Sequence, residues 1–195
     1  MEDHVVVDVE IAHAIGETIE VNGTPKTLTW DDTDLLGISC AVVYEHISDR
    51  FRVYGPNDTN RLRERLSSAD RISGYNIWKF DFPVIWQLPG RERVMSLREK
   101  TNDILVRIWR DGLGLNPDTF SSAHKGWSLD VVARATLGTG KSGYGGDAPK
   151  WYQQDQWAKL VDYCIDDVRI ERDLAAFVDK YHFVCGNGRI LHLPG

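Results

Sequence analysis

Two acidic residues, Asp8 and Glu10, lie two positions apart in an apolar segment where unpaired carboxylates are costly. Residues 5–10 are rich in β-branched valine and predict a buried strand. Because side chains alternate between the faces of a strand, Asp8 and Glu10 would share one face, opposite Val7 and Val9. Such like charges repel unless a cation lies between them, and a divalent metal ion would meet that need. In the alternative interpretation, Glu10 has left the strand for solvent and Asp8 only begins a turn.

A third carboxylate, Asp81, lies between Phe80 and Phe82 in a strongly hydrophobic stretch. A buried carboxylate needs a partner, which makes Asp81 a candidate for the same site. The simpler interpretation is that Asp81 caps the helix opened by Pro83.

Tyr163 and Asp167 stand four residues apart in a long helix that is predicted from an Asp155 cap to Lys180. This spacing places both side chains on one face of a helix, so they could serve one site. Asp166 is rotated from Asp167 by about 100° and is excluded. The alternative is an exposed tyrosine beside a surface acid.

The remaining pattern predicts an α/β fold with a mixed central sheet and helices on both faces. Strands are predicted at residues 5–10, 36–44, 51–54 and 71–76, with the first three forming an antiparallel meander, and residues 100–108 as a strand or a strand entering a helix. Helices are predicted at residues 57–68 with Asn57 or Asp58 as cap, at 78–88 with an effective start near Phe82, and at 129–137 capped by Ser128. Asn22-Gly23 and Gly186-Asn187-Gly188 predict hairpins over about 17–30 and 181–193.

The glycine-rich segment 138–149 contains Gly140-Lys141-Ser142, which imitates the end of a phosphate-binding loop. The earlier glycine, Gly138, stands at the wrong distance, and the segment follows a helix where that motif requires a strand. We therefore exclude a nucleoside triphosphatase. Two interpretations remain: a loop whose Lys141 reaches a substrate phosphate, or a flexible connector.

Composition restricts the class of protein further. The 195 residues, 42% of them hydrophobic, suit a single domain over 1–195. The net charge of -6 argues against binding nucleic acid by bulk basicity. The cysteines Cys40, Cys164 and Cys185 form no zinc or disulfide pattern. No apolar run reaches membrane-spanning length, and the first strand begins too early to leave room for a signal peptide. We expect a cytoplasmic protein with no membrane partner.

Together these residues resemble a known family. Asp8-Val9-Glu10 on a first strand, Asn76 with Phe80-Asp81 at the head of a helix, and Tyr163 with Asp167 in a late helix resemble the three exonuclease motifs of the DEDD superfamily. The tyrosine is similar to that of the DEDDy branch, which includes the proofreading domains of DNA polymerases. The segment from Trp127 to Cys164 also resembles small stand-alone or helicase-associated members.

The resemblance implies a ribonuclease H-like fold and removal of nucleotides from 3′ ends with two Mg²⁺ or Mn²⁺ ions. Asp8 would bridge the two ions, and Glu10 and Asp167 would complete the ion on the nucleophile side. Asp81 would hold the second ion through water. Tyr163 would orient the attacking water, because a tyrosine is mostly protonated at its normal pKa.

Substrate contacts are predicted around the second motif and the glycine-rich loop. Trp78 or Phe80 would stack on a terminal base, with core packing as the alternative for each. Asn76 would contact the terminal nucleotide or only support the turn, and Lys141 would meet a phosphate. Ile11 follows Glu10 where many family members have Thr or Ser, so a hydroxyl group that could meet the 3′ end is missing beside the metal ligands.

The predicted substrate is the 3′ end of single-stranded DNA, slightly favoured over RNA, delivered by a helicase or polymerase partner. A first alternative is an RNA- or oligonucleotide-trimming nuclease of the same fold. A second alternative is a non-catalytic module that binds nucleic acid or a partner. The number of unpaired acids speaks against the second, because carboxylates repel phosphate.

Overall fold

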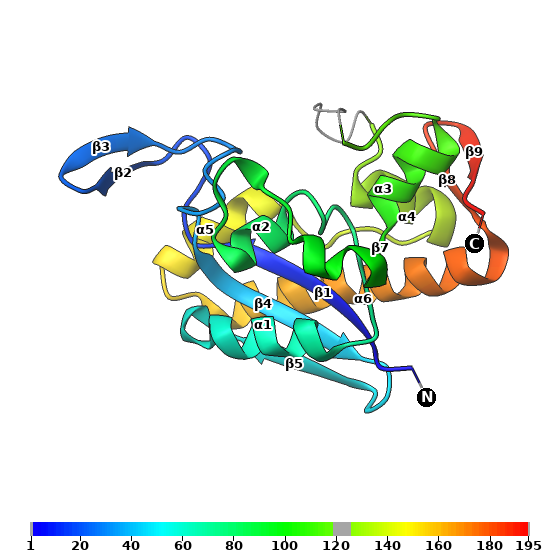
Figure 1. The fold of residues 1–195 in the computed structure, drawn as a ribbon, viewed down its shortest axis with the longest axis horizontal. Coiled ribbons are helices and arrows are strands. Elements are labelled where there is room, and N and C mark those ends of the chain that lie inside the picture. The colour runs from blue at the N-terminus through cyan, green and yellow to red at the C-terminus, as the bar shows by residue number, and fades with distance from the viewer. Residues whose placement is uncertain (1, 119–125, 195) are drawn as a thin grey trace.

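A five-stranded mixed sheet forms the centre of the protein (Figure 1). The computed structural model describes residues 2–118 and 126–194. The strand order is β5-β4-β1-β6-β7. The strands are β1 (His4–Ile11), β4 (Ile38–Glu45), β5 (Arg50–Tyr54), β6 (Arg71–Gly74) and β7 (Thr101–Asp103). β1, β4 and β5 pair antiparallel, whereas β1, β6 and β7 pair parallel. The predicted α/β class, with an antiparallel meander followed by parallel strands, is confirmed.

The alternation of side chains along β1 separates the two faces of the sheet. Val5, Val7 and Val9 pack in one core with α1 (Thr59–Ser68) and α2 (Asp81–Trp86). Val6 packs on the opposite face with α6 (Trp157–Tyr181) and the short α5 (Ala148–Gln153). Asp8 and Glu10 have the same parity as Val6, so they point to the face that α6 crosses.

A second group of elements packs against the C-terminal half of α6 and extends the core beyond β7. Its members are α3 (Ile104–Arg107) with one π-helical turn (Ile108–Gly112), α4 (Leu129–Leu137), β8 (Phe183–Gly186) and β9 (Arg189–His192). Ser128 caps α4 as predicted, because its Oγ accepts the Val131 N–H. The predicted C-terminal hairpin is confirmed by the pairing of β8 with β9.

The predicted hairpin after the first strand is also present. β2 (Thr18–Val21) and β3 (Thr24–Thr27) pair around Asn22-Gly23 and project from the body of the protein (Figure 1). Both turn residues have positive φ, as a tight hairpin requires. Within residues 2–118 and 126–194, no helix has the length and apolar character needed to cross a bilayer.

Two suggested helix caps are wrong, and a third is right in position only. Asp58 is the residue that precedes α1, but its carboxylate accepts the Gly55 N–H at 3.1 Å and the Arg61 guanidinium at 3.0 Å instead of a backbone N–H of the helix. The cap residue of α2 is Phe80, not Asp81. Asp155 has a φ of 55° in the left-handed region and closes the turn after α5, so α6 begins only at Trp157. The side chains of Asp58 and Asp81 bond elsewhere, to Gly55 and to Val9 of β1, and Asp155 is used by a turn.

Candidate active site

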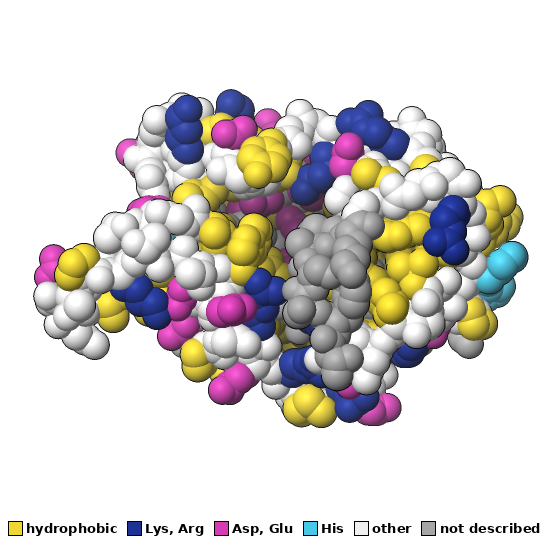
Figure 2. All heavy atoms as spheres, turned by 90° about the horizontal axis from the view of Figure 1, so that it is seen from above, with side chains coloured by type: hydrophobic (Ala, Val, Ile, Leu, Met, Phe, Trp, Pro, Cys, Tyr) yellow, Lys and Arg dark blue, Asp and Glu magenta, His cyan; other side chains and the backbone are white. Residues whose placement is uncertain are grey.

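The four predicted acids come together where α6 crosses β1 and the first turn of α2 approaches it. Glu10, Asp81 and Asp167 are 7, 3 and 1% exposed, and Asp8 is partly buried. The charge of at least one other member of the set raises the pKa of Asp8, Glu10 and Asp81. Figure 2 shows acidic side chains at the floor of a hollow in one face of the protein, with hydrophobic side chains at its rim.

Asp81 is positioned by β1 itself. Its Oδ1 accepts the backbone N–H of Val9 at 3.0 Å, a buried contact between residues 72 positions apart. The interpretation of Asp81 as a helix cap is therefore wrong. The hydrogen bond holds the start of α2 against the strand that carries Asp8 and Glu10.

The turn that leads from β6 to Asp81 is held by Asp103, at the end of β7. Asp103 accepts the N–H groups of Asn76 and Trp78, each at 2.9 Å, and those of Leu105 and Val106 at the start of α3. Asn76 adopts a φ of 66°, and its carbonyl accepts the N–H groups of Lys79 and Phe80. Four backbone N–H groups thus converge on the Asp103 carboxylate.

Tyr163 and Asp167 lie on the face of α6 that is turned to the sheet. Both are buried, so the interpretation of Tyr163 as an exposed tyrosine is wrong. The Tyr163 ring packs edge-on against Trp151, with ring centroids 5.4 Å apart. Asp166 points away and pairs with Arg169 at 2.7 Å, as the helical rotation predicts.

Lys141 reaches into the acid cluster from the glycine-rich loop. Its Nζ lies 2.5 Å from Asp167 Oδ2 and 5.1 Å from the centroid of the Tyr163 ring. The loop is fixed to α4, because Asp130 accepts the Lys141 N–H at 2.8 Å. It also packs closely on the tyrosine: a Cβ at Gly143 would lie 3.2 Å from the Tyr163 ring. Lys141 is thus the internal counter-ion of the cluster.

Burial and mutual repulsion shape the protonation of the site. Burial, and then the charge of Asp167, raise the pKa of Asp8 to about 7. Burial and the Asp8 charge also raise the pKa of Glu10 and Asp81 well above their usual range. For Lys141 burial alone would lower the pKa, but the charges of Asp167 and Asp8 raise it overall. The metal-free cluster therefore retains protons near neutral pH, and a bound cation would displace them.

Cys164 is a hydrogen-bond donor to this site. Its Sγ lies 3.6 Å from both the carbonyl oxygen and Oδ2 of Asp8. One ligand atom each from Asp8, Glu10 and Cys164 lie within 4.8 Å of one another. Burial raises the pKa of the Cys164 thiol, which stays protonated and is a poor metal ligand in that form. The oxygens that remain suit a hard cation such as Mg²⁺ or Mn²⁺.

The sequence interpretation missed a fifth buried acid, Glu171 on α6, which is 1% exposed. Burial and the charges of Asp8, Asp81 and Asp167 raise its pKa. The signal was present in the sequence, because Tyr163, Asp167 and Glu171 follow one another at intervals of four residues.

The predicted substrate-contact residues separate into two groups. Trp78 and Ile11 are buried in the core of the α1 and α2 side, Ile11 just after a register shift that follows Glu10. Phe80 is partly exposed and packs edge-on against Trp30, which is 54% exposed. Phe80 and Trp30 therefore form the aromatic surface beside Asp81, and the sequence did not indicate Trp30.

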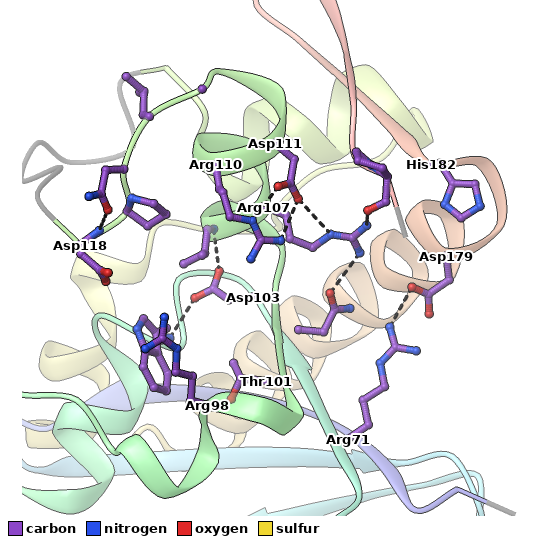
Figure 3. A pocket seen from close by; sticks show the side chains of 18 residues that line it. Arg71, Arg98, Thr101, Asp103, Arg107, Arg110, Asp111, Asp118, Asp179 and His182 are labelled. Atoms are coloured by element: carbon purple, nitrogen blue, oxygen red, sulfur yellow. Dashed lines mark hydrogen bonds and ion pairs between the residues drawn. The ribbon is translucent and has the colours of Figure 1, made fainter.

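A cavity of about 1160 Å³ opens beyond β7, away from the acid cluster (Figure 3). Two of the arginines that line it are paired with acids: Arg71 with Asp179 at 2.8 Å, and Arg110 with Asp111 at 2.6 Å. None of the five predicted catalytic residues lines this cavity. The buried acid cluster, rather than the larger cavity, concentrates the reactive groups.

Comparison with known proteins adds no relative. No protein-family model matches the chain, and no curated protein sequence matches it.

The pKa of Asp8 predicts how the stability of the metal-free protein changes with pH. Its pKa is about 7 in the folded protein and 3.8 when unperturbed, so the folded state binds more protons between these values. The free energy of unfolding should therefore fall as pH rises through that window and level off above it. His4 acts in the opposite direction, because burial lowers its pKa from 6.5 to about 4. Comparison with Asp8→Asn cancels the His4 contribution.

We expect the melting temperature of Asp8→Asn to match that of the wild type near pH 4 and to rise above it as pH approaches 7. Thermal unfolding in chelator across this range measures the difference. A difference that does not vary with pH would contradict the raised pKa of Asp8.

Lys141→Met should destabilise the metal-free protein, because it leaves the buried Asp167 carboxylate without its ion-pair partner. We expect a loss of about 3 kcal/mol at alkaline pH and a smaller loss in mild acid, where Asp167 takes up a proton. Urea unfolding in chelator measures it. Lys150→Met, on the exposed side of α5, is the matched control. Equal stability of the two variants would show that the pair contributes nothing.

Proposed function

We propose that this chain is a metal-dependent 3′-to-5′ exonuclease of the DEDDy type, built on a ribonuclease H-like fold. The observation that carries the proposal is the buried convergence of Asp8, Glu10, Asp81 and Asp167, from three separate elements, beside a buried tyrosine. The order of the strands, antiparallel and then parallel, supports it.

The donor set fits divalent cations. It is made of carboxylate oxygens, and Oδ1 of Asp167 is buried without a hydrogen-bond partner among the described residues. Two Mg²⁺ or Mn²⁺ ions would be held by Asp8, Glu10, Asp81 and Asp167. When bound, such ions lower the pKa of the attacking water and stabilise the leaving 3′ oxygen.

The protein's own groups then orient the substrate and the water. Burial raises the pKa of Tyr163, so the phenol stays protonated and acts as a hydrogen-bond donor that positions the water, not as a base. The Lys141 ammonium beside Asp167 is placed to meet a phosphate oxygen. The Phe80 and Trp30 rings offer a stacking surface for the terminal base.

The substrate we propose is a single-stranded DNA end, with trimming of RNA by the same site as the alternative. A non-catalytic binding module is disfavoured by the site itself. Buried carboxylates near a phosphate chain repel it unless cations intervene, and a protein selected only for binding gains nothing from them.

The experiment is degradation of 5′-labelled single-stranded DNA and RNA of equal sequence, with Mn²⁺, Mg²⁺ or chelator. We expect a metal-dependent ladder that shortens from the 3′ end, while a circular DNA of the same sequence stays intact. Absence of shortening with either metal, or cleavage of the circle, would reject the proposal. The faster of the two linear substrates identifies the preferred sugar.

A further inference from the structure

One buried carboxylate beside the cluster has no part in the proposed chemistry. Glu171 lies one helical turn after Asp167 on the same face of α6 and is 1% exposed. Its Oε2 is buried and has no hydrogen-bond partner among the described residues. A carboxylate enclosed in this way is costly unless a cation meets it.

The charge of Lys141 acts on Glu171, but the ammonium group itself is bound to Asp167 and lies over the Tyr163 ring. Among residues 2–118 and 126–194 no ion pair joins Glu171 to a lysine or arginine, although Lys141 forms one with its neighbour on the helix.

Glu171 is close enough to the other acids to be affected by their charges. Burial and the charges of Asp8, Asp81 and Asp167 raise the pKa of its carboxyl group. Tyr75, whose pKa is raised in part by Glu171, donates to the carbonyl of Trp127 and offers no cation. Glu171 therefore belongs to the same acid cluster.

We propose that the Glu171 carboxylate is a further ligand of the metal centre held by the acid cluster. This inference rests on the proposed function and deepens it.

The test is calorimetric titration of the full chain with Mn²⁺ at constant pH, comparing the wild type, Glu171→Gln and Asp166→Asn. Asp166→Asn is the matched control, because it removes a carboxylate from the same helix outside the cluster. We expect the wild type and the control to bind two ions. Glu171→Gln should keep one ion and bind the other at least about tenfold more weakly. Its melting temperature in chelator should not fall, because glutamine is a neutral group of similar shape to the protonated carboxyl that the raised pKa of Glu171 favours.

Two results would overturn the inference in distinguishable ways. Wild-type affinity for both ions in Glu171→Gln would reject the role of Glu171 and leave the proposed function standing. Absence of Mn²⁺ binding by the wild type would reject both. If Glu171→Gln does not fold, Glu171→Asp takes its place. Its shorter side chain draws the carboxylate back by one methylene, which should lower the affinity for one Mn²⁺ ion. Unchanged affinity for both ions would again reject the role of Glu171.

Discussion

Asp8→Asn should lower the rate of nucleotide removal by at least about 1000-fold, which corresponds to about 4 kcal/mol of lost transition-state stabilisation. Asp8 lies in the middle of the acid cluster, and its charge acts on Glu10, Asp81 and Glu171. Asparagine preserves the shape but removes the charge that two metal ions would share. Single-turnover degradation of a 5′-labelled oligonucleotide with saturating Mn²⁺ measures the effect.

Asp166→Asn serves as the control for this comparison, because Asp166 pairs with Arg169 outside the cluster. It should retain wild-type turnover. The folded state of Asp8→Asn can be verified by its melting temperature in chelator, which should equal or exceed that of the wild type. A folded Asp8→Asn variant with more than about a tenth of wild-type turnover would show that Asp8 does not hold the metals.

Asp103→Ala should lower the free energy of unfolding by about 4 kcal/mol, because it removes the hydrogen-bond acceptor of four backbone N–H groups at once. Loss of the α3 cap contributes about 1 kcal/mol, and the buried N–H groups of Asn76 and Trp78 add about 1–3 kcal/mol each. Urea unfolding measures the total. Asp111→Ala, a partly exposed acid that pairs with Arg110 nearby, is the control and should cost less than about 1 kcal/mol.

The same variant tests how Asp81 is positioned. Asp103 holds the turn that leads into α2, so the residual folded protein should also bind Mn²⁺ more weakly than the wild type. A variant with wild-type stability would mean that water satisfies those N–H groups as well as the carboxylate does.

The sequence predicted the features that depend on local periodicity. Strand alternation placed Asp8 and Glu10 on one face, and helical spacing placed Tyr163 beside Asp167 and turned Asp166 away. The antiparallel meander followed from apolar runs separated by polar segments, and both hairpins followed from Asn-Gly turns.

The features that the sequence did not predict depend on contacts between distant segments. Asp103 gathers N–H groups from a turn 25 or more residues away, and Asp81 bonds to a strand 72 residues away. From the sequence of its loop, Lys141 could be interpreted as a phosphate-binding residue or as part of a flexible connector. Only the tertiary packing of the loop brings Lys141 to Asp167. The misplaced cap at Asp155 arose because a side chain suited to a cap is equally suited to a turn.

The most direct test of the central claim, that the buried acid cluster is a two-metal centre, is the location of Mn²⁺ by its anomalous diffraction in crystals of the wild-type chain. The account predicts two Mn²⁺ peaks enclosed by the carboxylates of Asp8, Glu10, Asp81 and Asp167, with Lys141 displaced from its ion pair with Asp167. Manganese found only at exposed acids, with the Lys141 and Asp167 pair intact, would contradict it.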